Sequence, residues 1–152
     1  MKRIAMLCTA AALGVTLSAG ALAQAKPERL VDQRQAGMNL IGWYFGPIGA
    51  MVQDKMPYDA NVVKRNAGYL ATLSMMPIEG FQASTKDVKS DAKPEVWSDH
   101  DTFKSRMKDM QDAIAKLNTV AQAGADKDAV KAAFGGAGKA CKACHDDFRV
   151  KK

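Results

Sequence analysis

Cysteine and histidine are scarce in this chain of 152 residues, which holds three cysteines and two histidines. Cys8 lies in an N-terminal apolar stretch, so the rest of the chain offers only Cys141 and Cys144. A disulfide across so short a loop would remove little chain entropy from the unfolded state. A structural disulfide is therefore a poor explanation for this pair of thiols.

Strand patterns, long apolar runs and one-sided charge are also missing. No alternation of apolar and polar residues competes with helical spacing. Beyond residue 23 no apolar run is long enough for a membrane span, so we expect a soluble mature protein. The 22 basic and 16 acidic residues are interleaved and form no basic stripe with aromatic residues between the charges. Nucleic acid is therefore not an expected partner.

The N-terminus has the layout of a secretory signal peptide. Two basic residues precede an uncharged stretch over residues 4–17, and Ala21-Leu22-Ala23 forms a small-x-small cleavage site. A membrane anchor is the alternative, but a span needs about 20 apolar residues. We predict that residues 1–23 are removed and that residues 24–152 form one domain in the periplasm.

The spacing of apolar residues predicts helices in the second half of the chain. One stripe recurs in steps of four and three residues: Phe103, Met107, Met110, Ile114, Leu117 and Ala121. A second stripe has the same steps: Val130, Phe134, Ala137, Cys141, Cys144 and Phe148. We expect Ser98 and Asp101 to cap the first of these helices and Gly124 to end it. Asp126 is the expected N-cap of the second helix.

Two more helices are predicted in the first half. One begins near Pro27, a favoured first-turn residue, and carries along one side Leu30, Arg34, Met38, Ile41 and Phe45. Gly46-Pro47 should kink or interrupt it before it resumes to about Gln53. The other runs from about Asp59 to Met76, with Pro77 ending it. Its inward-facing residues are expected to be Val63, Ala67, Leu70 and Leu73.

Four helices with these connections predict an all-α protein. The loops near residues 55–58 and 124–126 are short, so helices adjacent in sequence should be antiparallel. Residues 77–97 form a long surface crossover, with one helical turn expected near Trp97. The predicted architecture is an antiparallel up-down-up-down four-helix bundle.

A C-x-x-C-H motif ends the last helix, formed by Cys141, Cys144 and His145. This pattern attaches haem c, because two thiols three residues apart on a helix can reach both vinyl groups of one haem. The histidine, four residues after the first cysteine, can then bind the iron. A zinc site would need four ligands and only His100 remains, while a thioredoxin-type dithiol needs a βαβ context. We predict one covalent haem c.

Three segments resemble cytochrome c′, the class II c-type cytochromes: "CKACHDDFR", the "RQ" of Arg34-Gln35, and "KPEVW" in the crossover. The similarity spans about residues 26–152. Most small c-type cytochromes carry C-x-x-C-H near the N-terminus, so its position here is specific to this family. The resemblance implies a haem protein for electron transfer and gas binding rather than an enzyme.

The resemblance assigns roles along the last helix. Cys141 and Cys144 match the thioether cysteines, and His145 matches the proximal axial ligand. Arg149 matches a basic residue beside that ligand; the alternative is a solvated arginine favoured by the helix dipole.

The first helix and the crossover also match family positions. Arg34 and Gln35 match residues beside the haem, with the arginine near a propionate. Arg34 also interrupts an apolar stripe, and a buried cation needs a paired anion. A snorkelling arginine at the bundle end is the alternative. Phe81 and Trp97 are expected to wall the pocket, or else to be core aromatics.

Met38 occupies the family's distal position, opposite His145. With an open iron face the protein would have a five-coordinate iron that binds NO or CO; with Met38 as sixth ligand it would be a low-spin electron carrier. Gly37 would allow close helix approach, which mildly favours ligation, but the full-length similarity favours the five-coordinate form. A cofactor-free structural bundle is the third hypothesis.

Partners are predicted only by class. Periplasmic or membrane-bound redox proteins would exchange electrons with the haem. Family members often form dimers through the first two helices, and Trp43, Tyr44 and Met51 could supply an apolar face for a homodimer or belong to the core. His100 sits among acidic residues and is expected to be solvated.

Overall fold

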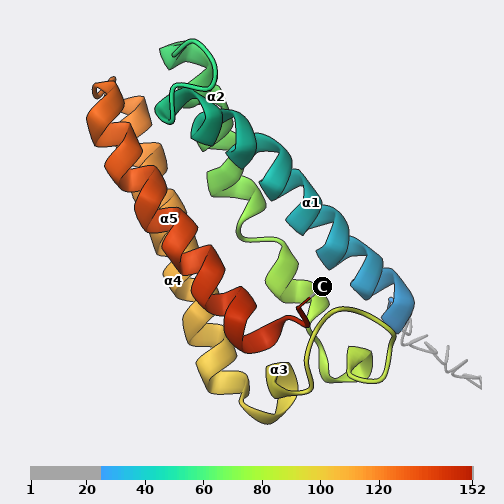
Figure 1. Ribbon diagram of the computed structural model, residues 1–152. Helices are drawn as coiled ribbons and strands as arrows, with labels where there is room; N and C mark the ends of the chain where they lie inside the picture. Colours follow the sequence, from blue (N-terminus) through green and yellow to red (C-terminus); the bar gives the residue numbers. More distant parts are fainter. Residues whose placement is uncertain (1–24, 152) are drawn as a thin grey trace, which may run out of the picture.

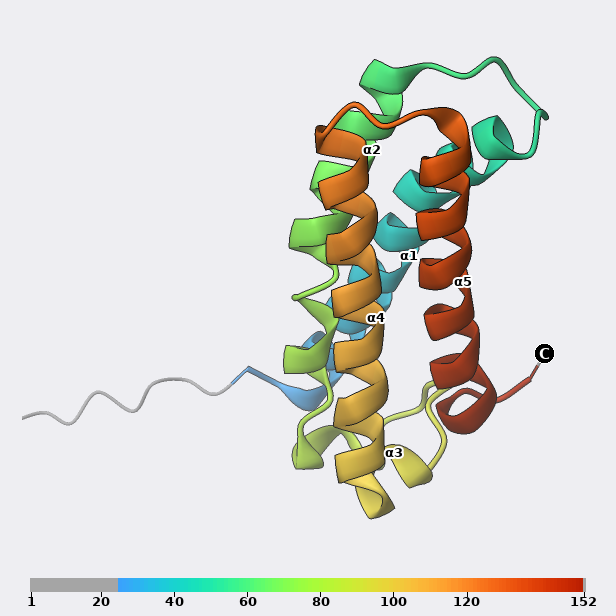
Figure 2. The same ribbon diagram turned by 90° about the vertical axis from the view of Figure 1, so that its left-hand side faces the viewer.

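Four long helices form the protein in the computed structural model, which describes residues 25–151 (Figure 1). They are α1 (Pro27–Val52), α2 (Ala60–Leu73), α4 (His100–Gln122) and α5 (Lys127–Phe148). Short loops join α1 to α2 and α4 to α5, so each pair is antiparallel (Figure 2). The predicted antiparallel four-helix bundle is confirmed. The predicted signal peptide lies outside the described residues.

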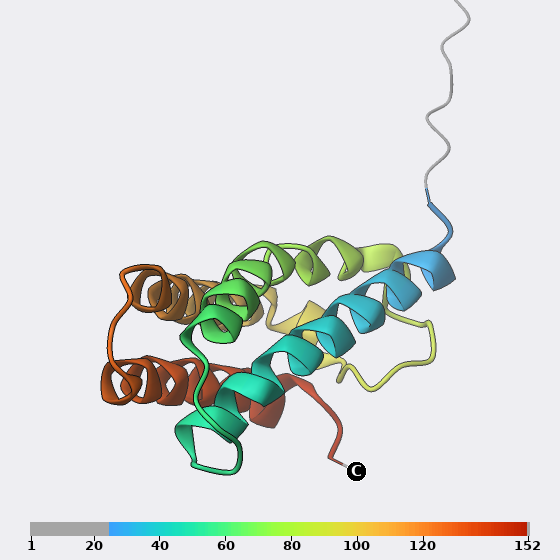
Figure 3. The same ribbon diagram turned by 90° about the horizontal axis from the view of Figure 1, so that it is seen from above.

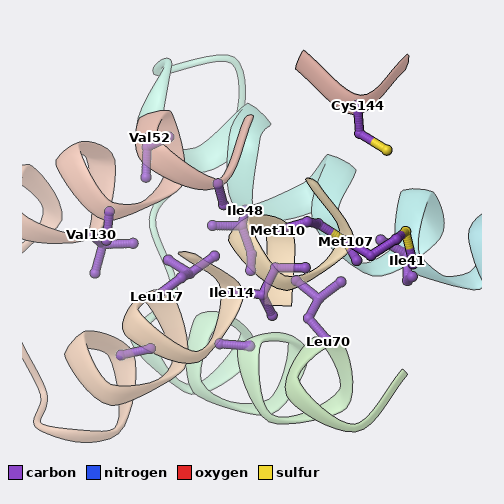
Figure 4. Packing of buried hydrophobic residues seen from close by; sticks show 14 of the residues in the cluster. Ile41, Ile48, Val52, Leu70, Met107, Met110, Ile114, Leu117, Val130 and Cys144 are labelled. Atoms are coloured by element: carbon purple, nitrogen blue, oxygen red, sulfur yellow. The ribbon is translucent and has the colours of Figure 1, made fainter. Parts of the chain in front are cut away.

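The core lies along the bundle axis. All six residues of the predicted α4 stripe are buried, and α2 buries Val63, Ala67 and Leu70 as expected. Figure 4 shows side chains of Ile48, Leu70, Ile114 and Leu117, each fully enclosed, meeting from α1, α2 and α4. Burying one such side chain stabilises the fold by about 1.5–3 kcal/mol. No helix in residues 25–151 is long and apolar enough to cross a membrane.

Most of the residues predicted at the helix ends are found there in the structure. The Asp59 carboxylate accepts from the backbone N–H of Asn61, and Asp126 accepts from that of Ala129. Both aspartates therefore satisfy donors that an α-helix leaves unpaired at its N-terminus. Gly124 has a φ of +71° and follows α4, where a residue with a side chain would be strained.

The expected interruption of α1 is not found, because the helix continues through Gly46-Pro47. Pro47 lacks the N–H that would bond the carbonyl of Trp43. Trp43 is 75% exposed, so that carbonyl lies on the solvated side, while Ile48 on the opposite side is fully buried. Packing of the buried face therefore carries the helix across the proline.

The end of α2 and the start of α4 also differ from the prediction. Met75 and Met76 bond to carbonyls three residues back, which tightens the last turn and ends α2 before Met76. Ser98 is the last residue of the short helix α3 (Glu95–Ser98), so Asp99, not Ser98, is the N-cap of α4. The predicted helical turn near Trp97 is confirmed as α3.

The crossover connects α2 to α4 and contains, besides α3, the 3-10 turns η1 (Pro77–Gly80) and η2 (Ala83–Thr85). It lies at the end of the bundle where α1 begins and α5 ends (Figure 1). Seen from above, α1 runs obliquely to α5 and diverges from it toward this end (Figure 3). The site lies where these helices diverge.

Candidate haem-binding site

A cavity of about 650 Å³ opens between α1, α4, α5 and the crossover. This is within the usual size range of cofactor pockets. Its lining includes Cys141, Cys144 and His145 together with Met38, so the structure brings the predicted attachment motif and the predicted distal residue to one space.

The α5 wall carries the C-x-x-C-H motif. Cys144 is 8% exposed, and Cys141 and His145 are half-buried. Burial raises the pKa of the Cys141 thiol, and burial together with the neighbouring Cys141 raises the pKa of Cys144 to about 11. Burial and then the nearby Arg149 lower the pKa of His145. Two protonated thiols and a neutral imidazole on one helix face are the donor set that haem c attachment requires, so these residues fit the cofactor.

Arg34 projects from α1 to the crossover wall and is only 3% exposed. One guanidinium nitrogen, Nη1, donates to the carbonyl of Gly80 at 2.7 Å and to Oγ1 of Thr85 at 2.9 Å. The other, Nη2, donates to Oγ of Ser90 at 2.9 Å. Burial lowers the pKa of this guanidinium, which nevertheless stays charged. The snorkelling alternative is therefore wrong, because the charged group lies inside the protein.

The aromatic residues of the crossover separate into two roles. Phe81 lines the cavity and lies under the Arg34 guanidinium, 4.5 Å from carbon to ring centroid. Trp97 is half-buried against the core and is absent from the lining; its indole N–H donates to the carbonyl of Gln82 at 3.1 Å. Of the two predicted wall residues, only Phe81 faces the cavity.

The α1 wall carries Met38, which is half-buried, and Gln35, which is exposed at the cavity edge. Gly37 does not line the cavity: a Cβ there would lie 3.1 Å from Cγ of Pro77. The absence of a side chain at Gly37 therefore allows α1 to pack closely against the crossover. Gly37 therefore does not favour ligation of the iron by Met38.

Several lining residues were not predicted as site residues. Met107, Met110 and Phe103 of α4 line the cavity, although the sequence indicated them only as core. Figure 4 shows Met107 and Met110 beside Ile41, with Cys144 above them. A stripe of apolar residues has the same spacing whether it faces a neighbouring helix or a cofactor, so the sequence held no signal for the distinction.

Arg149 lies at the mouth of the cavity, exposed, as the C-cap of α5. Its backbone pairs with Ala92 of the crossover in an isolated antiparallel bridge. The residue is therefore fixed at its backbone beside His145, whose pKa it lowers.

The family model described as Cytochrome C' matches residues 29–149. The chain belongs to the cytochrome c′ family. It is 44% identical to cytochrome c′ of Alcaligenes xylosoxydans xylosoxydans, over 84% of this chain and 98% of the relative. It is 40% identical to cytochrome c′ of Rubrivivax gelatinosus, over 83% of this chain and 98% of the relative.

A solved structure of the family has the same fold. A nitric oxide complex of a mutant cytochrome c′ from Alcaligenes xylosoxidans superposes with a TM-score of 0.79 at 44% identity, covering 85% of this chain and 99% of the other. The protein is thus a c-type cytochrome of the cytochrome c′ family, which carries one covalent haem c near the C-terminal helix and serves in electron transfer.

Proposed function

We propose that this cytochrome c′ is exported to the periplasm, transfers electrons, and binds small diatomic gases such as NO and CO at a five-coordinate iron. The observation that carries the proposal is the arrangement of the cavity. The attachment motif lies on α5, and the α1 side presents the apolar Met38, Ile41 and Phe45, with the exposed Gln35 and Asn39 beside them. An apolar surface of this kind disfavours anions such as hydroxide and admits neutral diatomics.

Each residue of the motif has a role in the proposal. The thiols of Cys141 and Cys144 form the two thioether bonds, and His145 is the proximal ligand, offered as a neutral imidazole because burial lowers its pKa. Arg149 lies beside it and disfavours a second positive charge there. When bound, the haem supplies an iron that alternates between ferric and ferrous states and can take a small ligand.

Arg34, Gln35 and Phe81 hold the cofactor from the other side. The three hydrogen bonds of Arg34 use three of the five N–H donors of a guanidinium. Arg34 also lines the cavity, so its remaining donors support a contact with a haem propionate. Gln35 at the cavity edge would add a neutral donor, and Phe81, which lines the same cavity, would offer an apolar face to the bound haem.

Met38 decides between two forms of the function. In the proposed form its flexible thioether is an apolar lid over the open iron face. The nitric oxide complex of a mutant cytochrome c′ 44% identical to this chain supports an accessible iron. In the alternative form Met38 is the sixth ligand and the protein is a low-spin electron carrier. A cofactor-free structural bundle is not supported, because the family carries haem c.

We propose no enzymatic activity. A peroxidase needs a polar acid–base pair over the iron. His100, the only other histidine, is exposed on the first turn of α4, with Nδ1 3.1 Å from the carbonyl oxygen of Val96, and does not line the cavity. Its position matches the expected solvated residue.

A homodimer and redox partners complete the proposal. Leu40, Trp43 and Tyr69 are 45%, 75% and 47% exposed on α1 and α2, and the ring of Tyr44 contacts that of Tyr69 with centroids 4.9 Å apart. A second copy covering these residues would form the dimer. Met51 is 2% exposed, so of its two expected places, the apolar face or the core, it occupies the core. Redox proteins of the periplasm or membrane would be the electron partners.

Titration of the ferrous holoprotein with NO, followed by absorption, tests the proposed gas binding. Uptake of one NO for each chain is expected. A spectrum unchanged by excess NO would contradict the proposal and leave the electron carrier as the function.

A further inference from the structure

We propose that Arg34 and Lys93 are positioning residues of the haem site. Through residues 90–93, here called the strap, they tie α1, which carries Met38, to the end of α5, which carries His145. The strap thereby sets the width of the cavity between these two side chains. The inference rests on the proposed function in one respect: the cavity is taken to hold the haem.

The α1 end of the strap is held by a buried charge. Arg34 hydrogen-bonds the crossover at Gly80, Thr85 and Ser90, three points spread over eleven residues of chain. A buried cation is costly unless its donors are paired, so the fold is stable only when the crossover places its acceptors next to the guanidinium. Close packing reinforces the arrangement, since a Cβ on Gly80 would lie 2.5 Å from the carbonyl oxygen of Leu30.

The α5 end of the strap is held by the last turn of the helix. The Lys93 ammonium donates to the carbonyl oxygens of Asp146 and Asp147 at 2.9 and 3.0 Å, and the Lys93 backbone N–H donates to that of Phe148 at 2.9 Å. These acceptors belong to the carbonyls that a helix leaves unpaired at its C-terminus, where a cation is also favoured by the helix dipole. Lys93 therefore caps α5 within three residues of His145.

Ser90 joins the two ends. Its hydroxyl oxygen accepts from Nη2 of Arg34 and from the backbone N–H of Ala92, at 2.9 and 3.3 Å. Ala92 in turn forms the antiparallel bridge with Arg149, and the Val150 N–H donates to the Asp91 carbonyl at 2.9 Å. A continuous set of hydrogen bonds thus runs from α1 to the end of α5.

Direct packing between α1 and α5 lies away from the strap. Phe45 stacks on Phe134, with ring centroids 4.1 Å apart, in the half of the bundle where the two helices are close. Toward the haem motif the helices diverge, and the crossover lies between their ends (Figures 1 and 3). The Phe45–Phe134 stack therefore holds α1 against α5 in one half of the bundle. The strap connects the two helices in the other half, where they diverge. Ser90, Asp91 and Ala92 also line the cavity themselves.

This arrangement bears directly on the iron ligands. Function at such a site depends on side-chain placement to about 0.5 Å. A longer or looser strap lets α1 move relative to α5, and so changes whether the Met38 thioether covers the iron face or leaves it. The strap is therefore the part of this chain that controls access of a diatomic ligand.

The test uses the holoprotein with Ser90→Ala and Lys93→Met, which release the strap at opposite ends. Ser105→Ala and Lys108→Met, at exposed positions of α4, are the matched controls. The readouts are the CO association rate, the ferric absorption spectrum, and hydrogen exchange of the Val150 amide, which needs no haem chemistry.

Each strap variant is expected to change the CO association rate by about threefold or more, as is typical of energetic coupling within a protein. Exchange of the Val150 amide should rise by about tenfold or more, since its bond to the Asp91 carbonyl opens more readily. The double variant should change the CO association rate no more than the more effective single variant does, because losing either contact releases the same segment. Arg34→Lys, which keeps the charge but loses the planar fork, should raise exchange of the Val150 amide as Ser90→Ala does.

Two results would overturn the inference. One is a CO rate in both strap variants that equals the control values, even with a lowered melting temperature, because the strap would then be only structural. The other is strictly additive effects in the double variant. A wild-type protein that is low-spin and ignores CO would instead refute the proposed function. In that case the strap is tested by whether the same variants reduce the low-spin fraction.

Discussion

Phe45 on α1 stacks on Phe134 on α5 with ring planes inclined by 19° and centroids 4.1 Å apart. The contact is possible because Gly49, one turn after Phe45, has no side chain: a Cβ there would lie 2.6 Å from Cζ of Phe134. This stack closes the cavity at the end away from the strap, since Phe45 also lines the cavity.

The first prediction concerns Gly49. Its substitution by alanine should lower the free energy of unfolding by about 1–3 kcal/mol, because the methyl group displaces a packed ring. Gly135→Ala on α5 is the control: its Cβ would meet nothing within 4 Å, so helix propensity alone should raise stability by about 0.5–1 kcal/mol. Denaturant unfolding of the holoproteins measures both. Equal effects of the two substitutions would contradict the stacked arrangement.

The second prediction concerns the thioether bonds. Cys141→Ser and Cys144→Ser should each leave the haem attached by one bond, and the double variant should release it on denaturation. Haem staining after denaturing electrophoresis should therefore persist in both single variants and be lost in the double variant. Staining that survives in the double variant would show that these cysteines do not hold the cofactor.

The third prediction concerns Met38. Met38→Leu replaces the thioether by an apolar group of similar volume, so a lid role predicts an unchanged ferric spectrum and a change in stability below about 1.5 kcal/mol. Met75→Leu, at a position 55% exposed, is the control. Conversion of the variant from low-spin to high-spin would instead identify Met38 as the sixth ligand.

The fourth prediction concerns the α1–α2 face. Trp43→Glu should shift the protein from dimer to monomer, because a carboxylate cannot be buried unpaired in an apolar interface. Met56→Glu, in the loop after α1 and 41% exposed, should leave the dimer intact. Sedimentation equilibrium reads the association state. A wild-type protein that is monomeric at all concentrations would refute the proposed homodimer.

Much of the fold was predictable because its signals are local. The α4 stripe repeats with helical period and all six residues are buried as predicted. The attachment motif spans five residues, so the sequence alone places its thiols and imidazole on one helix face. The break predicted at Pro47 failed because buried packing around Ile48 outweighs one lost backbone hydrogen bond.

The rest of the site depends on contacts that the sequence does not show. Arg34 and Ser90 are 56 residues apart in sequence, and no periodicity links them. The sequence marks Lys93 only within the family-like "KPEVW" segment, because a residue that caps a helix ending 55 residues later leaves no local pattern. The sequence leaves Met51 either on an apolar dimer face or in the core, because the buried face of α1 shifts along its length, to Ile48, Met51 and Val52.

The absorption spectrum of the purified holoprotein, ferric and then ferrous, before and after CO, tests the central claim most directly. We predict a high-spin spectrum that shifts on addition of CO, with Met38 as a lid over an open iron face. A low-spin spectrum with a thioether-to-iron band in the far red and no response to CO would contradict this account and make the protein a six-coordinate electron carrier.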